Sequence, residues 1–383
     1  MKIGLFTDTY VPDTNGVVTV IRLMERELSR AGHEVYVFAP AYPGHVETRS
    51  EVYRFPSVRM VLYEGMRIAL PVVSRRVLRL ISCMDIVHSH DPFSVGQVGF
   101  WAARWYRIPH VHTYHTLYME YRRYLPRPLR PPRRTVEQLS RTFCNRCDAI
   151  VAPSRQMEKE LQAYGVTVPT YPIPVGVDED DFARPIEWNA RQEFGLLTND
   201  LLLFAGRLGL EKNLEFLLRA FRRLLPERPS ARLVIAGGGP QHKHLERYAV
   251  ELGVGNKVTF TGHLPRERLI DLYKQATLFV FASKTETQGL VLVEAMMAGV
   301  PPVALGKMGV LDVVAHGETG LLVDEDEEEF ATACLRLLAN EGERRRLGEA
   351  ARTGAISQSA RSSTAKLIQI YEEVAAQRAA TQT

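Results

Sequence analysis

At 383 residues the chain is longer than one hydrophobic core usually supports, so we expect two domains. Its composition, 45% apolar and 24% charged, is that of an ordinary globular protein. No apolar run approaches the roughly 18 residues of a membrane span, and the amino terminus has too short an apolar run for a signal peptide. The sequence therefore predicts a cytoplasmic protein whose contact with a membrane is peripheral.

The net charge of +4 is unevenly distributed along the chain. Residues 1–170 hold 23 Lys and Arg against 15 Asp and Glu, whereas residues 171–383 hold 25 against 29. A basic half beside an acidic half indicates that the first half meets a polyanionic surface. Charge alone does not distinguish a membrane from a nucleic acid.

The first half opens with a strand at residues 2–7, a turn at 13–16, a helix at 17–31 and a second strand at 33–39. This βαβ order predicts a doubly wound parallel sheet of the α/β class. Asn15 and Gly16 at the head of the helix suit a loop that approaches a phosphate. The three-glycine dinucleotide fingerprint is missing, so a nicotinamide cofactor is not supported.

Five histidines follow or flank two predicted strands, at 86–91 and 109–116. They are His88, His90, His110, His112 and His115. A zinc cluster and core histidines bonded to the backbone are two readings. We favour a polar pocket in which His115 reaches a substrate hydroxyl. The four cysteines include a Cys144/Cys147 pair, but without a second pair or a histidine at ligand spacing we interpret them as free thiols.

Residues 121–146 carry eight arginines against a single acid, with aromatic and aliphatic side chains between them. We expect this segment to lie against an anionic lipid surface, because such mixtures suit the membrane interface. The expected membrane-facing residues are Arg122, Arg123, Tyr124, Arg127, Arg130, Arg133 and Arg134. A solvated loop interrupted by prolines is an alternative, and nucleic acid is disfavoured because no binding module accompanies the charge.

The second half repeats the alternation of strand and helix, so we expect a second doubly wound domain. Residues 171–178 are rich in proline and glycine and are interpreted as the interdomain linker. The predicted domains are 1–173 and 174–362, with residues 363–383 forming a helix that crosses back onto the first.

The most informative stretch runs from Glu286 to Glu294 and joins a predicted strand at 276–282 to a helix. A loop that turns into a helix exposes unpaired N–H groups, so we expect a phosphate near Gly289. In the second domain Arg207 and Lys212 flank another strand-to-helix loop and could hold a diphosphate. Alone, this pair could equally be surface charges.

Four features together resemble the retaining nucleotide-sugar glycosyltransferases of the GT-B fold, family 4. They are the Glu-x7-Glu stretch, the Gly-Arg…Lys-Asn loop at 206–213, Gly-Gly-Gly-Pro at 237–240 and Asn-Gly-Val at 15–17. Within the family, TETQGL at 285–290 and HTYHTLY at 112–118 resemble bacterial 1,2-diacylglycerol 3-alpha-glucosyltransferases, which make glycolipids at the cytoplasmic membrane face.

The resemblance implies two Rossmann-like doubly wound domains facing a central cleft, and a role for each matching residue. Arg207 and Lys212 would hold the diphosphate and Glu286 the transferred hexose, with His115 touching the sugar from the opposite domain; these four are the expected catalytic residues. Gly16 would approach the phosphates and the sugar, and Glu294 would hold the ribose. His263 and Leu264 would contact the base. Backbone N–H groups would be offered by Gln288, Gly289, Leu290 and Val291.

We therefore expect an enzyme that moves a hexose, α-glucosyl from UDP-glucose, to diacylglycerol with retained configuration. The family requires no cofactor and no obligatory metal. The expected partners are a nucleotide-sugar, diacylglycerol or a related lipid, and an anionic membrane at the inner face of the cell membrane. Alternatives are a family-4 mannosyl- or galactosyltransferase with another lipid or polysaccharide acceptor, and a non-catalytic nucleotide-sugar-binding protein, which the catalytic set disfavours.

Overall fold

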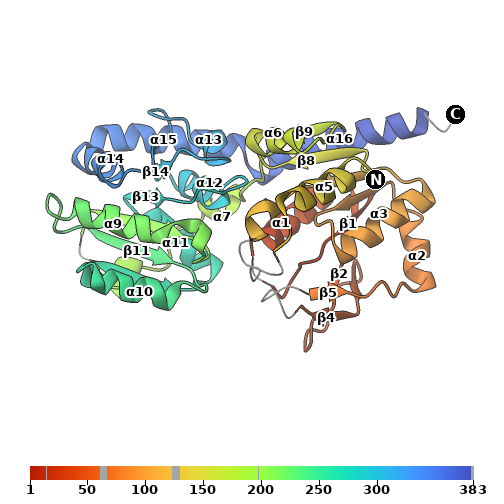
Figure 1. Cartoon of the computed structure of the whole chain (residues 1–383), viewed down its shortest axis with the longest axis horizontal. Coiled ribbons are helices and arrows are strands. Elements are labelled where there is room, and N and C mark those ends of the chain that lie inside the picture. Colours follow the sequence, from red (N-terminus) through yellow and green to blue (C-terminus); the bar gives the residue numbers. More distant parts are fainter. Residues whose placement is uncertain (14, 61–66, 123–129, 197, 381–383) are drawn as a thin grey trace. The chain divides into compact units, whose positions relative to one another are not determined.

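The computed structural model describes residues 1–13, 15–60, 67–122, 130–196 and 198–380 (Figure 1). The chain divides into two compact units. Met1–Gly176 together with Ala360–Thr383 form the first domain, and Val177–Ser359 form the second. The sequence placed these boundaries after residues 173 and 362, and the structure places them after residues 176 and 359.

The first domain is built on a parallel sheet that, within the described residues, has seven strands in the order β3-β2-β1-β6-β7-β8-β9. The strands are β1 (Lys2–Phe6), β2 (Glu34–Pro40), β3 (Val52–Phe55), β6 (Ile86–Ser89), β7 (His110–Thr113), β8 (Ala149–Ala152) and β9 (Thr170–Pro172). A separate antiparallel pair consists of β4 (Ser57–Arg59) and β5 (Arg67–Ala69). The predicted doubly wound sheet is confirmed.

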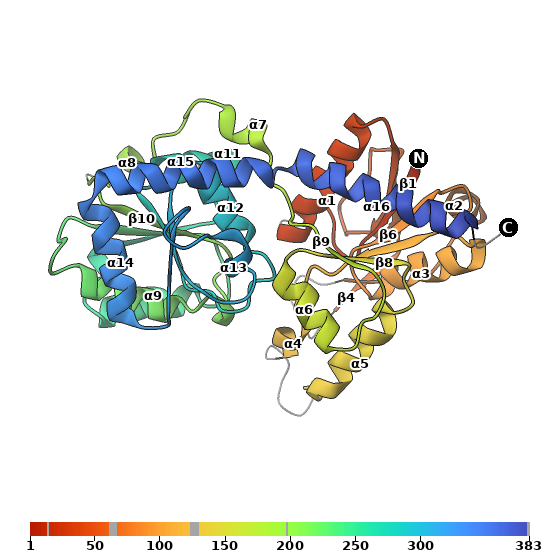
Figure 2. The same ribbon diagram turned by 90° about the horizontal axis from the view of Figure 1, so that it is seen from above.

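Helices cover both faces of this sheet. They are α1 (Gly16–Arg30), α2 (Arg75–Ile81), α3 (Ser94–Tyr106), α4 (Tyr118–Tyr121), α5 (Arg133–Cys144), α6 (Arg155–Ala163) and α16 (Ala360–Ala380). Figure 2 shows α16 alongside α1, and these two helices bury Ile21, Ile370 and Tyr371 against Ile3 and Leu5 of β1. The carboxyl-terminal helix is therefore part of the first domain's core.

Two glycines let α3 approach the other face of β1. Phe6 stacks on Phe38 with ring centroids 4.3 Å apart. A Cβ built on Gly4 would lie 3.0 Å from the Phe6 ring, and one built on Gly99 of α3 would lie 2.7 Å from Cγ of Phe6. Larger residues would displace the stacked rings, because a packed core has no spare volume. These glycines fix how α3 sits over the end of β1.

The linker is shorter than the sequence suggested. Tyr171 and Pro172 belong to β9, which pairs with β8 at the edge of the first sheet. Proline is tolerated there because an edge strand has one side without a ladder. The proline-rich segment lies between α4 and α5, and its residues 123–129 lie outside the described part of the chain.

The second domain repeats the design with a parallel sheet of six described strands in the order β12-β11-β10-β13-β14-β15. They are β10 (Leu201–Ala205), β11 (Arg232–Ala236), β12 (Val258–Gly262), β13 (Leu278–Phe281), β14 (Pro302–Leu305) and β15 (Leu321–Val323). The predicted second Rossmann-like domain is also confirmed.

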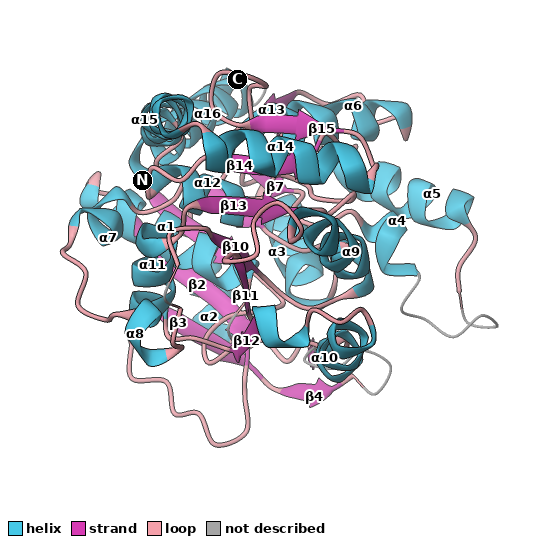
Figure 3. Cartoon of the chain, turned by 90° about the vertical axis from the view of Figure 1, so that its left-hand side faces the viewer, coloured by secondary structure: helices cyan, strands magenta, loops and turns pink. Residues whose placement is uncertain are grey.

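Its helices again lie on both faces (Figure 3). They are α7 (Glu179–Ala183), α8 (Ala190–Glu193), α9 (Leu214–Leu224), α10 (His242–Glu251), α11 (Arg266–Gln275), α12 (Leu290–Met297), α13 (Val310–Val313), α14 (Glu327–Ala339) and α15 (Glu341–Ser357), with 3₁₀ turns η3 (Leu210–Lys212) and η4 (Gly255–Lys257). Helices α9, α10 and α14 share one face, and α11, α12 and α15 share the other.

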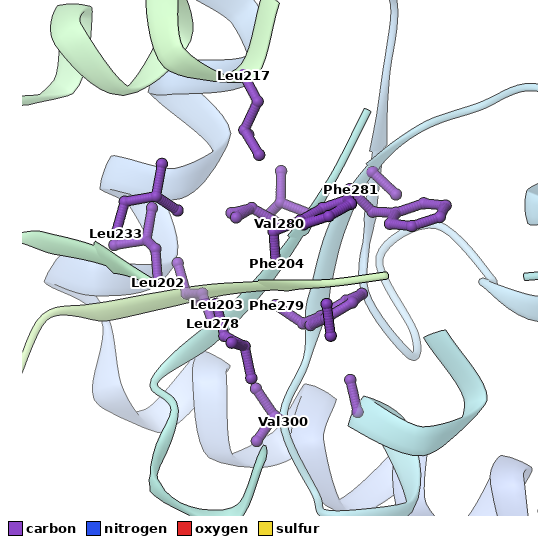
Figure 4. Close-up of a cluster of buried hydrophobic side chains, with 14 of the residues drawn as sticks. Leu202, Leu203, Phe204, Leu217, Leu233, Leu278, Phe279, Val280, Phe281 and Val300 are labelled. Carbon is purple, nitrogen blue, oxygen red and sulfur yellow. The ribbon is translucent and has the colours of Figure 1, made fainter. Parts of the chain in front are cut away.

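The centre of the second domain is a layer of fully buried strand residues. Figure 4 shows Leu217 of α9 and Val300 on opposite sides of β10 and β13, whose side chains alternate between them. Phe204 and Phe281 stack with ring centroids 5.9 Å apart. Strands that are covered on both faces read as continuous apolar runs, which is how the sequence revealed them.

In the part of the chain that the structure describes, none of the helices combines the length and hydropathy needed to cross a bilayer.

We expect Ile370→Ala to lower the free energy of unfolding of the first domain by about 2–5 kcal/mol, because truncating a buried isoleucine leaves a cavity. Ile370 is 4% exposed in the core that α16 shares with β1. Hydrogen exchange followed by mass spectrometry should show lost protection in first-domain peptides and little change in second-domain peptides. The matched control is Gln369→Ala, an exposed neighbour on the same helix. Equal effects of the two substitutions would contradict a structural role for α16.

Candidate functional site

The two loops that the sequence singled out meet at one point of the second sheet. The winding of the chain reverses between β10 and β13, which are neighbours in the sheet. Open α/β sheets bind ligands at the carboxyl ends of strands beside such a reversal. Arg207 and Lys212 follow β10, and Glu286 follows β13. The fold therefore predicts a ligand site here.

A lysine and a glutamate form an ion pair across this reversal. The Lys212 ammonium group bonds Oε1 of Glu286, and the two side chains are only 16% and 15% exposed. Lys212 also lies over the ring of Phe281, 5.8 Å from its centroid. Because both charges are largely removed from water, losing either partner would leave the other poorly compensated.

Glycines allow the loops beside this pair to pack backbone to backbone. The Leu208 N–H donates to Gly238 O at 2.9 Å. A Cβ on Gly237 would lie 2.0 Å from Gly206 O, and one on Gly239 would lie 2.6 Å from Leu208 O. The Gly-Gly-Gly-Pro motif thus closes the loop after β11 onto the loop that carries Arg207, whose side chain is exposed.

The loop after β13 is held in place from its other side. The Gly309 N–H donates to Glu286 O at 3.0 Å, and a Cβ on Gly309 would lie 2.4 Å from Thr287 O. Gln288 is buried, and Gly289 caps α12 with a φ of 87°, a conformation that favours glycine. Gly289 has no side chain to cap the helix, so the first turn of α12, with Leu290 and Val291 half-buried, can donate to an anion.

Glu294 on α12 is buried and already bonded through both oxygens. The Tyr273 hydroxyl donates to Oε2 at 2.9 Å, and Arg266 bonds Oε1. Burial and then the adjacent carboxylate raise the pKa of Tyr273, so the phenol stays a donor. A carboxylate oxygen accepts about two hydrogen bonds, so each oxygen of Glu294 retains capacity for a ligand hydroxyl.

His263 and Leu264 follow β12 at the same edge of the sheet. The His263 ring is exposed and lies against Gly238, where a Cβ would come within 2.6 Å of Nε2. Leu264 is half-buried and packs on the second-domain core. Of the two expected base contacts, His263 therefore lies beside the glycine-rich loop, and Leu264 packs on the core next to it.

In the first domain the winding reverses between β1 and β6. Two aspartates follow these strands. Oδ2 of Asp91 accepts from the Asp8 N–H at 3.1 Å and from the Thr7 hydroxyl at 3.3 Å, while Oδ1 of Asp8 accepts from the Val95 N–H at 2.8 Å and from the Ser94 hydroxyl. Burial and then repulsion from Asp8 raise the pKa of Asp91 to about 7, and burial raises that of Asp8.

The five histidines lie in or directly after β6 and β7 and are all buried. The Ser89 hydroxyl lies 2.8 Å from both His110 Nε2 and His112 Nδ1, and His90 Nδ1 lies 2.9 Å from His115 Nε2. Burial lowers the pKa of His110 to about 3 and that of His115 to about 4. Those of His88, His90 and His112 are lowered well below the ordinary value for the same reason. The cluster is therefore neutral at physiological pH.

At the head of α1, Asn15 accepts from the Val18 N–H at 3.0 Å and donates to the Thr9 hydroxyl at 2.9 Å. Gly16 is exposed, and a Cβ built on it would have nothing within 4 Å. Nothing in the described chain itself therefore requires glycine at this position.

Among the described residues, no group of three or more His, Cys, Asp or Glu side chains is arranged to hold a metal ion. All four cysteines are free thiols, and burial raises the pKa of Cys144 to about 12.

Comparison with known proteins identifies the family. Residues 14–181 match the family model described as Glycosyltransferase Family 4, and residues 187–354 match that of Glycosyl transferases group 1. The Alpha-monoglucosyldiacylglycerol synthase of Streptococcus pneumoniae is 34% identical over 352 residues, covering 88% of this chain and 78% of the relative. The chain belongs to glycosyltransferase family 4.

Other relatives span different activities within the family. A second Alpha-monoglucosyldiacylglycerol synthase, from Acholeplasma laidlawii, is 27% identical and covers 86% of each chain. A GDP-mannose-dependent alpha-mannosyltransferase from Corynebacterium glutamicum is 29% identical, covering 98% of this chain and 90% of the relative. The Anabaena protein Alr3699/HepE, solved with UDP-glucose, has a TM-score of 0.76 at 19% identity, covering 97% of this chain and 100% of that one. This chain shares the fold of the Anabaena protein and has two doubly wound domains. It is therefore a glycosyltransferase of the GT-B fold.

Part of the glycosyltransferase's expected membrane-facing segment is described. Arg130, Arg133 and Arg134 are exposed at the start of α5, and Arg122 donates to Pro131 O at 2.6 Å. Arg123, Tyr124 and Arg127 lie outside the described residues.

Residues that sequence reasoning missed lie beside those it found. On α3, Trp101 and Trp105 are 58% and 83% exposed, on a helix whose Phe100 contacts Phe143 of α5. Their i, i+4 spacing on one face was a signal in the sequence. No local signal marked Arg266 as the partner of Glu294, because that contact depends on the packing of α11 against α12.

We expect acid to destabilise the first domain, by roughly 2–4 kcal/mol between pH 7 and pH 5.5. The folded pKa of each of the five histidines is lowered. Their contribution to stability is therefore present above the unfolded value of about 6.5 and is lost as pH falls. Asp8 and Asp91 act in the opposite direction, because a raised carboxyl pKa stabilises the fold at low pH. Because five histidines oppose two aspartates, the net effect of acid is a loss of stability.

Thermal unfolding at pH 7 and pH 5.5 measures this effect, and hydrogen exchange assigns it to a domain. Second-domain peptides serve as the internal control. A first domain that becomes more stable on acidification would contradict the neutral histidine cluster.

Proposed function

We propose that this glycosyltransferase moves an α-glucosyl group from UDP-glucose to the free hydroxyl of diacylglycerol in membrane glycolipid synthesis. The observation that carries the proposal is the Lys212–Glu286 ion pair beside the first turn of α12. It supplies a cation for a diphosphate next to a carboxylate for sugar hydroxyls. The pneumococcal and Acholeplasma relatives, named Alpha-monoglucosyldiacylglycerol synthases, support the choice of glucose and diacylglycerol.

The second domain would bind the donor. Arg207, Lys212 and the backbone N–H groups from Gln288 to Val291 would hold the diphosphate. In the free protein Lys212 is neutralised by Glu286. A diphosphate would compete for that ammonium group, and Glu286 would then be available to the hydroxyls of the hexose.

The nucleoside would lie farther along the same edge of the sheet. Glu294 would accept the ribose hydroxyls, because Arg266 and Tyr273 hold its carboxylate in place and leave acceptor capacity on both oxygens. His263 and Leu264 would contact the base. UDP-glucose bound to Alr3699/HepE, a protein of the same fold, supports a nucleotide-sugar ligand.

Transfer would retain the configuration of the sugar. The bond from the anomeric carbon to the diphosphate breaks while the acceptor oxygen approaches from the same face, and a phosphate oxygen takes the acceptor's proton. Arg207 and Lys212 would stabilise the charge on the leaving diphosphate, so we propose no cofactor and no obligatory metal. Gly16 would give room to phosphate and sugar, and the neutral His115 would hydrogen-bond the sugar.

The first domain would meet the acceptor at the inner membrane surface. Exposed arginines at the start of α5 suit anionic headgroups, and exposed indole rings on α3 suit the interface between headgroups and acyl chains. Helix α3 carries no acidic residue that would oppose this contact.

We expect a radiolabelled glucolipid when UDP-glucose is mixed with the enzyme and liposomes that contain diacylglycerol. UDP-galactose and GDP-mannose should give little product in the same assay. Product from GDP-mannose alone would favour the activity named for the Corynebacterium relative. Absence of a lipid product with every donor would exclude the diacylglycerol assignment.

Within that assay, Lys212→Met should lower kcat by about 10²–10³, the usual cost of losing one stabilising donor at a developing charge. The matched control is Lys284→Met, since Lys284 also pairs with a glutamate, Glu325, but is 43% exposed. Unchanged turnover in the Lys212 variant would show that the ion pair is not the donor site.

Neutralising Arg130, Arg133 and Arg134 together to glutamine should weaken binding to anionic liposomes by about 100-fold, because each arginine near such a surface contributes about 1 kcal/mol. Sedimentation with phosphatidylglycerol vesicles measures the loss, and added salt should weaken the wild type similarly. The charge-matched control replaces three exposed second-domain arginines, Arg222, Arg247 and Arg345. Equal losses of binding in the two triple variants would show that net charge, and not the position of these three arginines, controls binding to the vesicles.

A further inference from the structure

A buried hydrogen bond joins two histidine rings in the first domain. Nδ1 of His90 lies 2.9 Å from Nε2 of His115, and the rings are nearly parallel, with centroids 5.2 Å apart. His90 is fully buried and His115 is 9% exposed. Between two neutral imidazoles one nitrogen must carry the shared proton and the other must accept it.

The surroundings of the other ring nitrogen of His90, Nε2, determine which histidine donates and which accepts in this bond. Nε2 of His90 is buried without a hydrogen-bond partner among the described residues. A proton there would be an unpaired buried N–H, which is rare in proteins and costs about 1–3 kcal/mol. With the proton on Nδ1 instead, His90 donates to His115 and only a lone pair remains unpaired.

The direction of the bond fixes the tautomer of His115. If Nε2 of His115 accepts, the single proton of its neutral ring must be on Nδ1. Burial lowers the pKa of His115 to about 4, so the ring carries one proton at neutral pH. His115 also lines a cavity of about 40 Å³ with mainly apolar walls, which include Leu23 and Ile173.

The ring of His90 is itself held in place. It stacks on His88, with centroids 4.3 Å apart and ring planes 30° apart. His88 lies between two hydroxyls, with Nε2 at 2.7 Å from Thr113 Oγ1 and Nδ1 at 2.5 Å from the Tyr371 hydroxyl. A run of contacts therefore leads from α16 through His88 to the bond between His90 and His115.

We propose that His90 is a positioning residue that holds neutral His115 as the Nδ1–H tautomer, so that His115 serves the transfer reaction as a hydrogen-bond donor and not as a base. Its part in the reaction rests on the proposed function, whereas the tautomer does not. A donor on a mainly apolar wall is stronger than the same donor in water, and Nε2 cannot take a proton from the acceptor while it accepts from His90.

Nuclear magnetic resonance measures the tautomer without any substrate. Histidine labelled with ¹⁵N gives distinct shifts for protonated and unprotonated ring nitrogens, and the pattern lost in His115→Gln assigns His115. We expect the proton on Nδ1 in the wild type and in His90→Asn, since an asparagine amide can donate from nearly the position of Nδ1. In His90→Leu the Nδ1 preference should be lost. A wild-type His115 with its proton on Nε2 would overturn the proposal.

Kinetics then test the consequence. His90→Leu should lower kcat by about 10–100-fold, the loss seen when a histidine that binds a metal loses the hydrogen bond that orients its ring, with little change in KM for the donor. His90→Asn should recover most of the loss. Equal impairment of both variants at equal thermal stability, or full activity of His90→Leu, would count against the positioning role. If His90→Leu does not fold, the asparagine variant and the wild-type spectrum still decide the question.

These outcomes separate the two hypotheses. If His115 is the Nδ1–H tautomer but the protein transfers no sugar, the hydrogen bond from His90 is supported and the proposed function is contradicted. If the protein transfers sugar but His115 carries its proton on Nε2, the proposed function is supported and the positioning role of His90 is contradicted.

Discussion

Both domains depend on one constraint of parallel sheets. In each sheet the strand order reverses near the middle. The loops that follow the two strands at the reversal turn toward opposite faces of the sheet, which leaves an open crevice at the carboxyl ends of these strands. Here these pairs are β1 with β6 and β10 with β13. Asp8 and Asp91 follow the first pair of strands, and Arg207, Lys212 and Glu286 follow the second. The reactive chemistry is thus placed by topology, and the surrounding apolar strands serve to hold that topology rigid.

The second-domain site balances its charges within the free protein. Lys212 is paired with Glu286, and Glu294 with Arg266. Largely buried charges are costly unless they are paired, and here each carboxylate compensates a neighbouring cation. The pairing lets the domain fold without ligand; in the proposed function a diphosphate, which carries more charge than one carboxylate, would displace Glu286 from Lys212. Backbone contacts hold the loop that carries Arg207 against the loop after β11, and the Gly309 N–H holds the loop that carries Glu286.

The sequence predicted the fold well because buried parallel strands are continuous apolar runs, and strand and helix alternate regularly. It also placed Lys212 and Glu286 in one site, since strand ends that share a sheet edge converge. It extended the linker over Tyr171 and Pro172, because an edge strand containing proline has no apolar signature. Contacts between elements distant in sequence, such as Arg266 with Glu294 and Tyr371 with His88, were out of reach. They depend on how helices pack, which no local pattern encodes.

The two sites differ in charge in a way that agrees with a charged donor and a neutral acceptor. The second domain presents ammonium, guanidinium and carboxylate groups, whereas the first presents imidazoles that burial keeps neutral and two aspartates, Asp8 and Asp91, whose pKa values burial raises. A permanent charge beside an alcohol would be uncompensated before the acceptor bound and would gain little from it afterwards. Neutral rings avoid that cost, but a neutral imidazole has two tautomers, and only a fixed partner selects one. Under the proposed mechanism, that requirement would give His90, and through His88 the helix α16, a role beyond packing.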